Sequence, residues 1–261
     1  MRRITIAITT VALLALAAGA YAATGVNTYT GSLSFTSSKP GTPAAPVPAG
    51  FHEVFSAHNT TSGLDAAPLV DIKLKMYGLR IDSKDFPTCP LAKVQATLGA
   101  GCPKGSLVGS GPITAILGPT NLMGTPANTI NCTPLLDIWN AGHNQVIEFP
   151  VISAGHQCGG LQTGAAAPYV VTFRQSGKYL LQDAPLPPDV STNAGNLGLY
   201  NSLTLNDLTW SKLTRKVKGK TVSYLSSIGC QKHKRPYSMT FTATPDGVST
   251  QTVTLSAKAK C

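Results

Sequence analysis

Acidic residues that could do general acid–base chemistry are few in this chain of 261 residues, and Glu53 and Glu148 are its only glutamates. Asp137 and Glu148 stand on either side of a turn-like segment, residues 140–144. A hairpin there would bring the two carboxyl groups onto neighbouring strands. Two carboxylic acids about 5–9 Å apart are the pair that glycoside hydrolases use. Asp137 and Glu148 are therefore candidates for a secreted carbohydrate-active hydrolase, which is one alternative function of the chain.

No motif for metal binding, nucleophilic catalysis or nucleotide binding accompanies this pair. His143, His156 and Cys158 lack the H-x-x-x-H or C-x-x-C spacing of a metal site, and a cysteine in a disulfide is not a thiolate ligand. The chain has no G-x-S-x-G nucleophile motif. Its glycine-rich segment, residues 105–111, lacks the Lys-Ser/Thr end of a phosphate-binding loop and is expected to form an ordinary loop. The sequence thus predicts no catalytic, cofactor-binding or metal-binding residues.

The N-terminus has the features of an export signal. Arg2 and Arg3 form a positive region, residues 4–18 are apolar or small, and Ala20-Tyr21-Ala22 is a small-x-small cleavage pattern. The apolar run of about 15 residues is too short for a comfortable membrane span, and no later stretch is suited to one. The paired arginines raise the twin-arginine route, but most of that motif is missing, so general secretion is favoured. We expect a secreted, extracellular or cell-envelope-associated protein without a transmembrane span after signal removal.

Six cysteines follow the signal, and an even number in an exported chain indicates disulfide bonds. Three bonds among six cysteines allow 15 connectivities. Pairing between cysteines that are neighbours in the sequence is favoured among them. The expected bonds are Cys89–Cys102, Cys132–Cys158 and Cys230–Cys261.

The C-terminal region gives one of these bonds a geometric argument. Apolar and polar residues alternate on either side of Pro245-Asp246-Gly247, which is typical of the turn in a β-hairpin. With this turn at the centre, Cys261 lies opposite residue 232, close to Cys230. Antiparallel neighbours are about 5 Å apart, a separation that a disulfide can span. The expected register therefore supports the bond between Cys230 and Cys261.

Other short segments rich in alternating or β-branched residues predict further strands, with turn residues between them. The expected strands are residues 32–35, 71–77, 145–152, 169–175, 203–210, 221–228, 237–243 and 252–257. His52 and His58 are expected to flank a loop.

The composition is rich in Gly and Pro and has only 12% charged residues, which favours strands and turns over helices. One helix is expected near residues 90–98, because Pro90 suits a first helical turn and Gly99 suits a helix end. We therefore predict an all-β fold, a disulfide-stapled β-sandwich with this one short helix. The predicted organisation is a signal peptide at 1–22, an extended segment and Pro-rich linker at 23–50, and a β-sandwich domain, one body or two packed halves, at 51–261.

Positive charge is concentrated at the C-terminal end of the chain. Residues 212–261 hold ten basic residues and one acidic residue, whereas residues 23–211 hold nine basic and ten acidic residues. Such a cluster either keeps a hairpin solvated or attracts an anionic polymer or lipid surface. Nucleic acid is a poor partner for an exported protein. The candidate residues for anionic-surface binding are Lys212, Arg215, Lys216, Lys218, Lys220, Lys232, Lys234 and Arg235.

The cysteine-containing segments have a recognisable pattern. The runs at residues 86–94 and 101–111, and Ser227-Ile228-Gly229-Cys230 followed by Arg235-Pro236-Tyr237, resemble segments of uncharacterised exported, cysteine-containing, β-rich proteins of high-GC Gram-positive bacteria. The resemblance covers residues 71–261. It implies export and a β-rich fold, and it carries over no catalytic residues.

The leading hypothesis is a non-enzymatic secreted or cell-envelope-associated protein that binds an anionic envelope surface through its basic C-terminal region. The first alternative is the carbohydrate-active hydrolase with Asp137 and Glu148. The second alternative is a purely structural surface protein. A cleft with converging carboxylates and aromatic side chains would favour the enzyme, a flat basic face would favour surface binding, and a sheet with neither would favour the structural role.

Overall fold

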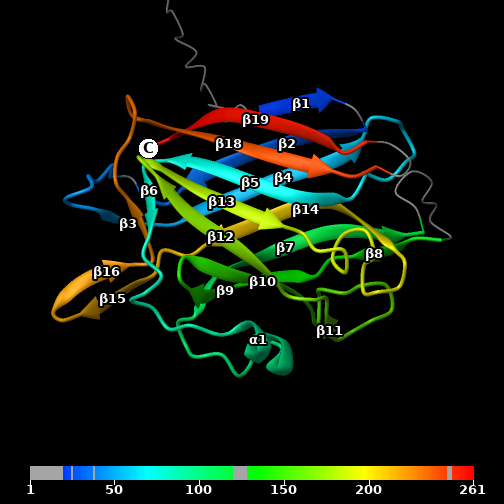
Figure 1. The fold of residues 1–261 in the computed structure, drawn as a ribbon, viewed down its shortest axis with the longest axis horizontal. Helices are drawn as coiled ribbons and strands as arrows, with labels where there is room; N and C mark the ends of the chain where they lie inside the picture. Colours follow the sequence, from blue (N-terminus) through cyan, green and yellow to red (C-terminus); the bar gives the residue numbers. More distant parts are fainter. Residues whose placement is uncertain (1–19, 25, 38, 120–127, 246–248) are drawn as a thin grey trace, which may run out of the picture.

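The computed structural model describes residues 20–24, 26–37, 39–119, 128–245 and 249–261 (Figure 1). Most of the predicted signal peptide, residues 1–19, lies outside the described residues, as do residues 246 and 247 of the predicted turn. The predicted cleavage point after Ala22 falls within the first described strand, β1. Strands dominate the described part of the chain, and α1 (Leu91–Thr97) is the α-helix within it.

The largest sheet has 14 strands, and each strand pairs antiparallel with its neighbours. Its path runs in the order β1 (Ala20–Thr24), β2 (Asn27–Phe35), β4 (Phe51–Asn59), β14 (Tyr200–Trp210), β7 (Leu107–Gly118), β9 (Leu135–Gly142), β10 (Gln145–Ile152), β12 (Tyr169–Ser176), β13 (Tyr179–Pro185), β5 (Leu69–Tyr77), β18 (Lys234–Ala243) and β19 (Gln251–Lys260). Off this path, β8 (Ile130–Cys132) pairs with β7 and β11 (Gly164–Ala165) pairs with β10.

Two small sheets lie at the end of the molecule that holds the C-terminus (Figure 1). One has three strands, in the order β3 (Val47–Ala49), β17 (Leu225–Ser227) and β6 (Leu79–Ile81). The other is the hairpin of β15 (Thr214–Val217) and β16 (Lys220–Ser223). The Pro-rich segment predicted as a linker thus ends in β3, an edge strand that pairs with β17.

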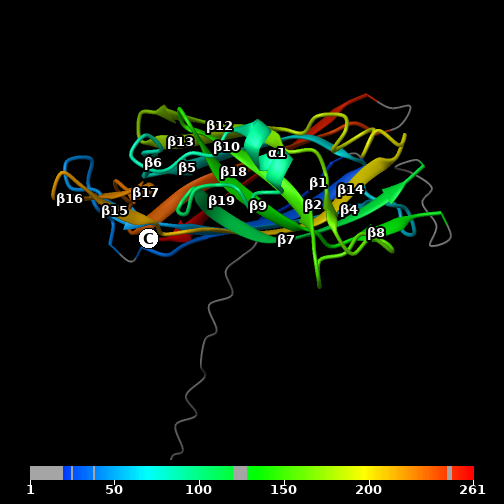
Figure 2. The ribbon, with the colours of Figure 1, turned by 90° about the horizontal axis from the view of Figure 1, so that it is seen from below.

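The large sheet folds over so that two layers face each other (Figure 2). The last strand, β19, runs beside β1 and β2, the first strands of the path. Aromatic residues join the layers: Tyr29 on β2 stacks on Phe241 of β18, with ring centroids 4.5 Å apart, and Phe55 on β4 packs on the same ring. The space between the layers holds the main apolar core, so the predicted disulfide-stapled all-β sandwich is confirmed.

The predicted strands are present in the structure, but several of them begin or end at other residues. The short segment at 32–35 is the end of β2, a nine-residue strand between β1 and β4, so the N-terminal segment is part of the sheet. The predicted strand at 221–228 is divided between β16 and β17. The alternation predicted along residues 237–243 and 252–257 holds, with Met239 opposite Leu255 and both buried.

Two segments expected to be loops are strands in the structure. His52 and His58 lie within β4, on the face opposite the buried Phe51 and Phe55, so these histidines do not flank a loop. The glycine-rich segment at 105–111 leads into β7, a strand of 12 residues. Glycine suits β7 because a Cβ at position 109 would lie 2.8 Å from the backbone oxygen of Thr209 on the neighbouring strand.

The helix and the bond that brackets it agree with the sequence. Cys89 and Cys102 form a disulfide around α1, and Val94 of the helix packs with Cys89 on the outer face of β9 and β10. The helix ends at Thr97, and after it Leu98 takes a φ of 50° and then Gly99 a φ of 80°. A Cβ there would lie 2.6 Å from the ring of Trp139, so this position needs glycine for both its backbone and its packing.

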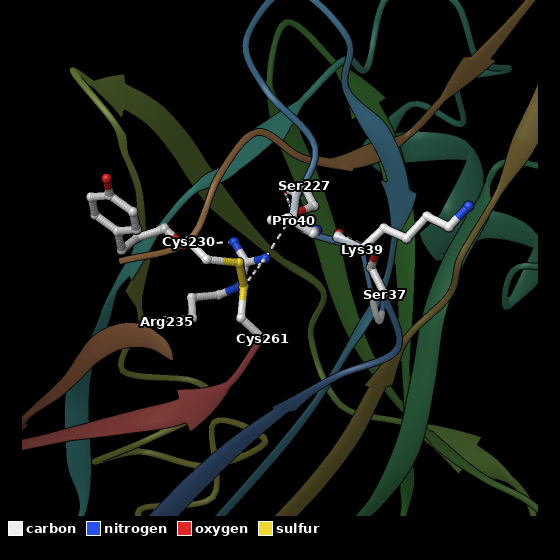
Figure 3. Close-up of a disulfide and its surroundings, with 8 residues drawn as sticks. Ser37, Lys39, Pro40, Ser227, Cys230, Arg235 and Cys261 are labelled. Atoms are coloured by element: carbon white, nitrogen blue, oxygen red, sulfur yellow. Dashed lines mark hydrogen bonds between the residues drawn. A yellow bond between two sulfur atoms is a disulfide. The ribbon is translucent and has the colours of Figure 1, made fainter. Parts of the chain in front are cut away.

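The other two disulfides, Cys132–Cys158 and Cys230–Cys261, also match the predicted pairing. In the C-terminal hairpin the register differs by one residue from the expected one, and the backbone N–H of Cys261 donates to the carbonyl of His233. This small shift leaves Cys230 within reach, so the geometric argument for the bond is confirmed (Figure 3).

Candidate ligand cavity

A cavity of about 200 Å³ lies between the two layers of the sandwich. Its walls are mostly aliphatic side chains from strands on both layers, including Ile72, Ile113, Leu136, Leu203 and Leu208. An empty apolar space of this kind inside a close-packed core is unusual, because interiors seldom contain voids larger than a water molecule. The cavity is therefore the first place to look for a binding function.

Glu53 and Glu148 both line this cavity, although they stand far apart in the sequence. Along β4, Phe51, Glu53 and Phe55 alternate inward, so Glu53 occupies a core position between two buried aromatic residues. Along β10, Glu148 alternates inward in the same way and is 4% exposed. The only two glutamates of the chain thus meet in one buried space.

Three further polar side chains enter the cavity from neighbouring strands. Gln182 lies on β13 and Tyr169 begins β12, and both are at inward positions. Asn206 on β14 would face outward if β14 alternated regularly from the buried Leu203. A register shift between Leu203 and Leu205 turns Asn206 inward. The bulge therefore places an amide next to the glutamates.

Each glutamate has one oxygen bound by the protein and one oxygen that is not. The hydroxyl of Tyr169 donates to Oε2 of Glu148 over 2.7 Å, and Nδ2 of Asn206 donates to Oε1 of Glu53 over 3.3 Å. Oε2 of Glu53 and Oε1 of Glu148 are buried and have no hydrogen-bond partner. The same holds for Oε1 of Gln182 and Oδ1 of Asn201, which also line the cavity. All four unpaired atoms are oxygens: those of Gln182 and Asn201 are acceptors, and those of Glu53 and Glu148 are acceptors when the carboxyl group is ionised.

Burial makes both glutamates weak acids. The loss of water raises the pKa of Glu53 from 4.5 to about 8, and the nearby charge of Glu148 adds to this rise. The buried indole N–H of Trp210 lies near this carboxyl group and acts in the opposite direction on its pKa. Burial also raises the pKa of Glu148 to about 7, against the opposing effect of the Tyr169 hydroxyl. Near neutral pH, the pair therefore carries on the order of one negative charge.

The cavity reaches the surface, since two of the residues that line it are largely exposed. Leu161 and Leu197 line it and are 59% and 73% exposed, so its mouth is apolar. Cys132 and Cys158 also line the cavity, and their disulfide ties the loop of Leu161 to β8. This bond fixes one side of the mouth.

The structure does not bring Asp137 and Glu148 together. Asp137 lies opposite Phe149 in the hairpin of β9 and β10, whereas Glu148 lies opposite Ile138. Paired residues share a face and successive residues alternate, so the two carboxyl groups are on opposite faces of the sheet. Asp137 accepts a hydrogen bond from the hydroxyl of Ser110 instead. The acid that does accompany Glu148 is Glu53, which sequence reasoning missed.

The histidines and cysteine considered as metal ligands stay apart. Cys158 is in a disulfide, His143 lies in the turn between β9 and β10, and His156 contacts the carbonyl oxygen of Thr133. Within the described residues, no group of three or more His, Cys, Asp or Glu side chains is arranged to hold a metal ion.

The predicted basic cluster separates into exposed residues and one buried residue. Arg235 is fully buried: Nη1 donates to the carbonyl of Tyr77, Nη2 donates to Oγ of Ser227, and the guanidinium lies over the ring of Phe35 (Figure 3). Burial lowers its pKa to about 10, so it stays charged. Arg235 therefore holds the fold together beside the Cys230–Cys261 bond and is not part of a surface.

The other members are exposed, and most lie on or near the β15–β16 hairpin, which extends from the end of the molecule that holds the C-terminus (Figure 1). Arg215 is partly engaged, because it donates to the backbone carbonyl of Asp85 over 2.8 Å. The remaining exposed basic residues of the predicted set are Lys212, Lys216, Lys218, Lys220, Lys232 and Lys234.

No protein-family model, curated protein sequence or solved structure matches the chain. In the described part of the chain, no helix has the length and apolar character that crossing a membrane requires.

Proposed function

We propose that the chain is an exported, non-enzymatic binding protein that encloses a small, largely apolar molecule in its interior cavity. The observation that carries the proposal is the cavity itself, about 200 Å³ with aliphatic walls and an apolar mouth. An apolar cavity of about 150 Å³ in another protein stays dry and binds benzene, so this space is large enough for a ligand of similar or slightly greater size.

Three disulfides suit an exported protein, because such bonds persist in oxidising compartments. The predicted signal peptide and the resemblance to exported proteins point in the same direction. The hydrolase alternative with Asp137 and Glu148 has no support in the geometry, since the two side chains are on opposite faces of the sheet. The cavity in which Glu53 and Glu148 converge is also a poor site for a sugar, because its walls are mostly aliphatic and would leave most of the hydroxyl groups of a sugar without partners.

The binding function is tested with benzene and n-hexanol as probes. Their binding is measured by ligand-observed NMR and by the change in the melting temperature of the protein. We expect both probes to bind the wild type and to raise its melting temperature. Ala184→Leu places a larger side chain in the cavity wall and should abolish binding. Ala92→Leu, on the exposed face of α1, is the matched control and should bind normally. If neither probe binds the wild type, the proposed function is wrong.

A second function has its own observation, the exposed basic hairpin of β15 and β16 at the end of the molecule that holds the C-terminus (Figure 1). We propose that its lysines hold the protein on an anionic polymer or lipid surface of the cell envelope. A basic segment near an anionic lipid surface gains about 1 kcal/mol per lysine or arginine. The attraction acts over about 8–10 Å at physiological salt, so it is short-ranged and sensitive to salt.

Envelope attachment is tested by measuring how much protein sediments with isolated cell envelopes. Wild type should be bound at low salt and released at about 1 M salt, where the screening length falls to about 3 Å. Replacing Lys216, Lys218 and Lys220 by Gln should release the protein at low salt without unfolding it. Lys73→Gln, an exposed lysine of β5, is the control and should stay bound. A substituted hairpin that binds as tightly as the wild type would show that the lysines only keep the hairpin solvated.

A further inference from the structure

We propose that the ligand of the cavity is a small amphiphile with a protonated amine, whose ammonium group binds between Glu53 and Glu148 and whose apolar part lies among the aliphatic side chains. This inference rests on the proposed binding function and specifies the chemical class of the ligand. It is carried by the set of polar atoms in the cavity, which is one-sided in both charge and hydrogen bonding.

Four oxygens that line the cavity have no hydrogen-bond partner, on Glu53, Glu148, Gln182 and Asn201. The protein supplies no donor to these oxygens, and a buried acceptor without a donor costs on the order of 1–3 kcal/mol. A carboxylate or phosphate group brings more acceptors and would add to the shortage. An ammonium group brings three donors and no acceptor, which is what the cavity lacks.

The charges of the lining residues also favour an ammonium group. Three acids line the cavity, Glu53, Glu148 and Asp189, and no lysine, arginine or histidine is among its lining residues. The other polar groups that line it are neutral: Tyr169, Gln182, Asn201 and Asn206. Removal of a charge from water is costly unless an opposite charge compensates for it. A cationic ligand supplies that compensation, and the glutamates in turn compensate for the buried ammonium.

The apolar walls make an inorganic cation a poorer occupant of the cavity than an amine with an attached hydrocarbon. Calcium takes six to eight oxygen ligands at 2.3–2.6 Å, and magnesium keeps a shell of waters. The lining of this cavity combines a few oxygen atoms with many aliphatic side chains, such as Ile72, Ile113 and Leu136. An amine with an attached hydrocarbon matches both parts, whereas a bare metal ion leaves the apolar volume unfilled.

The test compares three probes with the same chain length, n-hexylammonium, n-hexanol and hexanoate, by titration of the full protein at pH 7.5. We expect n-hexylammonium to bind at least tenfold more tightly than n-hexanol, and hexanoate to bind more weakly than either. In the doubly substituted Glu53→Gln, Glu148→Gln protein, the preference for the amine should fall below twofold while n-hexanol still binds. Asp183→Asn, an exposed acid outside the cavity, should keep the wild-type preference.

The outcomes separate the two proposals. Equal binding of n-hexylammonium and n-hexanol by the wild type overturns the amine inference and leaves the proposed function standing. Failure of all three probes to bind overturns both. Calcium chloride is titrated in parallel, first into the free protein and then into its complex with n-hexylammonium. Displacement of n-hexylammonium by millimolar calcium would show an inorganic cation site instead. The comparison among probes on the wild type decides the inference even if the double substitution fails to fold, and the single Glu148→Gln protein then serves as the second variant.

Discussion

Glu53→Gln should stabilise the protein at alkaline pH and have little effect at acidic pH. The carboxyl group of Glu53 is fully buried, and its pKa rises from 4.5 to about 8 on folding. A carboxyl group with a raised pKa binds its proton more tightly in the folded state. It therefore costs nothing at a pH below 4.5, and its cost grows as the pH rises toward 8. Glutamine has nearly the same shape and carries no charge at either extreme.

The size of the effect follows from the shift in pKa. One unit corresponds to 1.36 kcal/mol, so a rise from 4.5 to about 8 corresponds to about 5 kcal/mol at pH 9, as an upper limit. Relaxation of the cavity and entry of water reduce this value, and we expect a gain of about 2–5 kcal/mol for Glu53→Gln at pH 9. At pH 4.5 the gain should be smaller than about 1 kcal/mol.

The assay is urea unfolding of the wild type and the variant at both pH values, with the disulfides intact and without ligand. Other acids with raised pKa values, such as Asp137 and Asp65, contribute equally to both proteins and cancel in the difference. Asp183→Asn, whose side chain is 58% exposed, is the control and should show no such pH-dependent gain. A Glu53→Gln protein that is no more stable than the wild type at pH 9 would refute the reasoning, because the carboxylate would then be ionised without cost.

Three further substitutions test other parts of the structure. Arg235→Ala should destabilise the protein by about 3 kcal/mol or more in urea unfolding, because it removes a buried charged donor from the carbonyl of Tyr77 and leaves that oxygen unpaired. Gly99→Ala should cost about 1–3 kcal/mol, because its φ of 80° and the contact with Trp139 both oppose a Cβ; an unchanged unfolding midpoint would contradict this. Replacing Cys132 and Cys158 together by Ala should cost about 3–4 kcal/mol in the loop-entropy estimate and weaken n-hexanol binding, because the mouth loop is released.

Local patterns in the sequence were enough to predict much of the fold. Alternation along residues 237–243 and 252–257 gave the faces of β18 and β19, because period two is a direct property of the strand. The Cys230–Cys261 bond followed from the same register, and an error of one residue did no harm because a disulfide tolerates a range of Cα separations. These predictions depended only on residues near each other in the chain or joined by one hairpin.

The strands β4 and β7 were missed for identifiable physical reasons. In β4, Glu53 interrupts the apolar face between Phe51 and Phe55, so a buried acid hides the alternation. In β7, glycines at 109 and 111 lower the apparent strand propensity, although close approach of β14 favours them there. In both cases the tertiary neighbours, rather than the segment itself, decide the conformation.

The cavity could not be predicted, because its two acids come from strands that are separated by several neighbours in the sheet. β4 and β10 belong to facing layers, and that arrangement depends on how the whole sheet folds over. One signal was present in the sequence: both glutamates of the chain stand in step with apolar residues of a strand, Glu53 between Phe51 and Phe55 and Glu148 two residues after Val146. An acid in phase with core residues is a reason to expect a buried polar site.

The most direct measurement of the central claim is the set of intermolecular NOEs between n-hexylammonium and the wild-type protein. We predict contacts from the ligand methylene protons to the methyl groups of Ile113, Leu136 and Leu203, with chemical-shift changes at the side-chain carboxyl carbons of Glu53 and Glu148. These signals should disappear in Ala184→Leu. Contacts confined to surface residues, or none at saturating n-hexylammonium, would contradict the assignment of the cavity as the binding site for a small apolar amine.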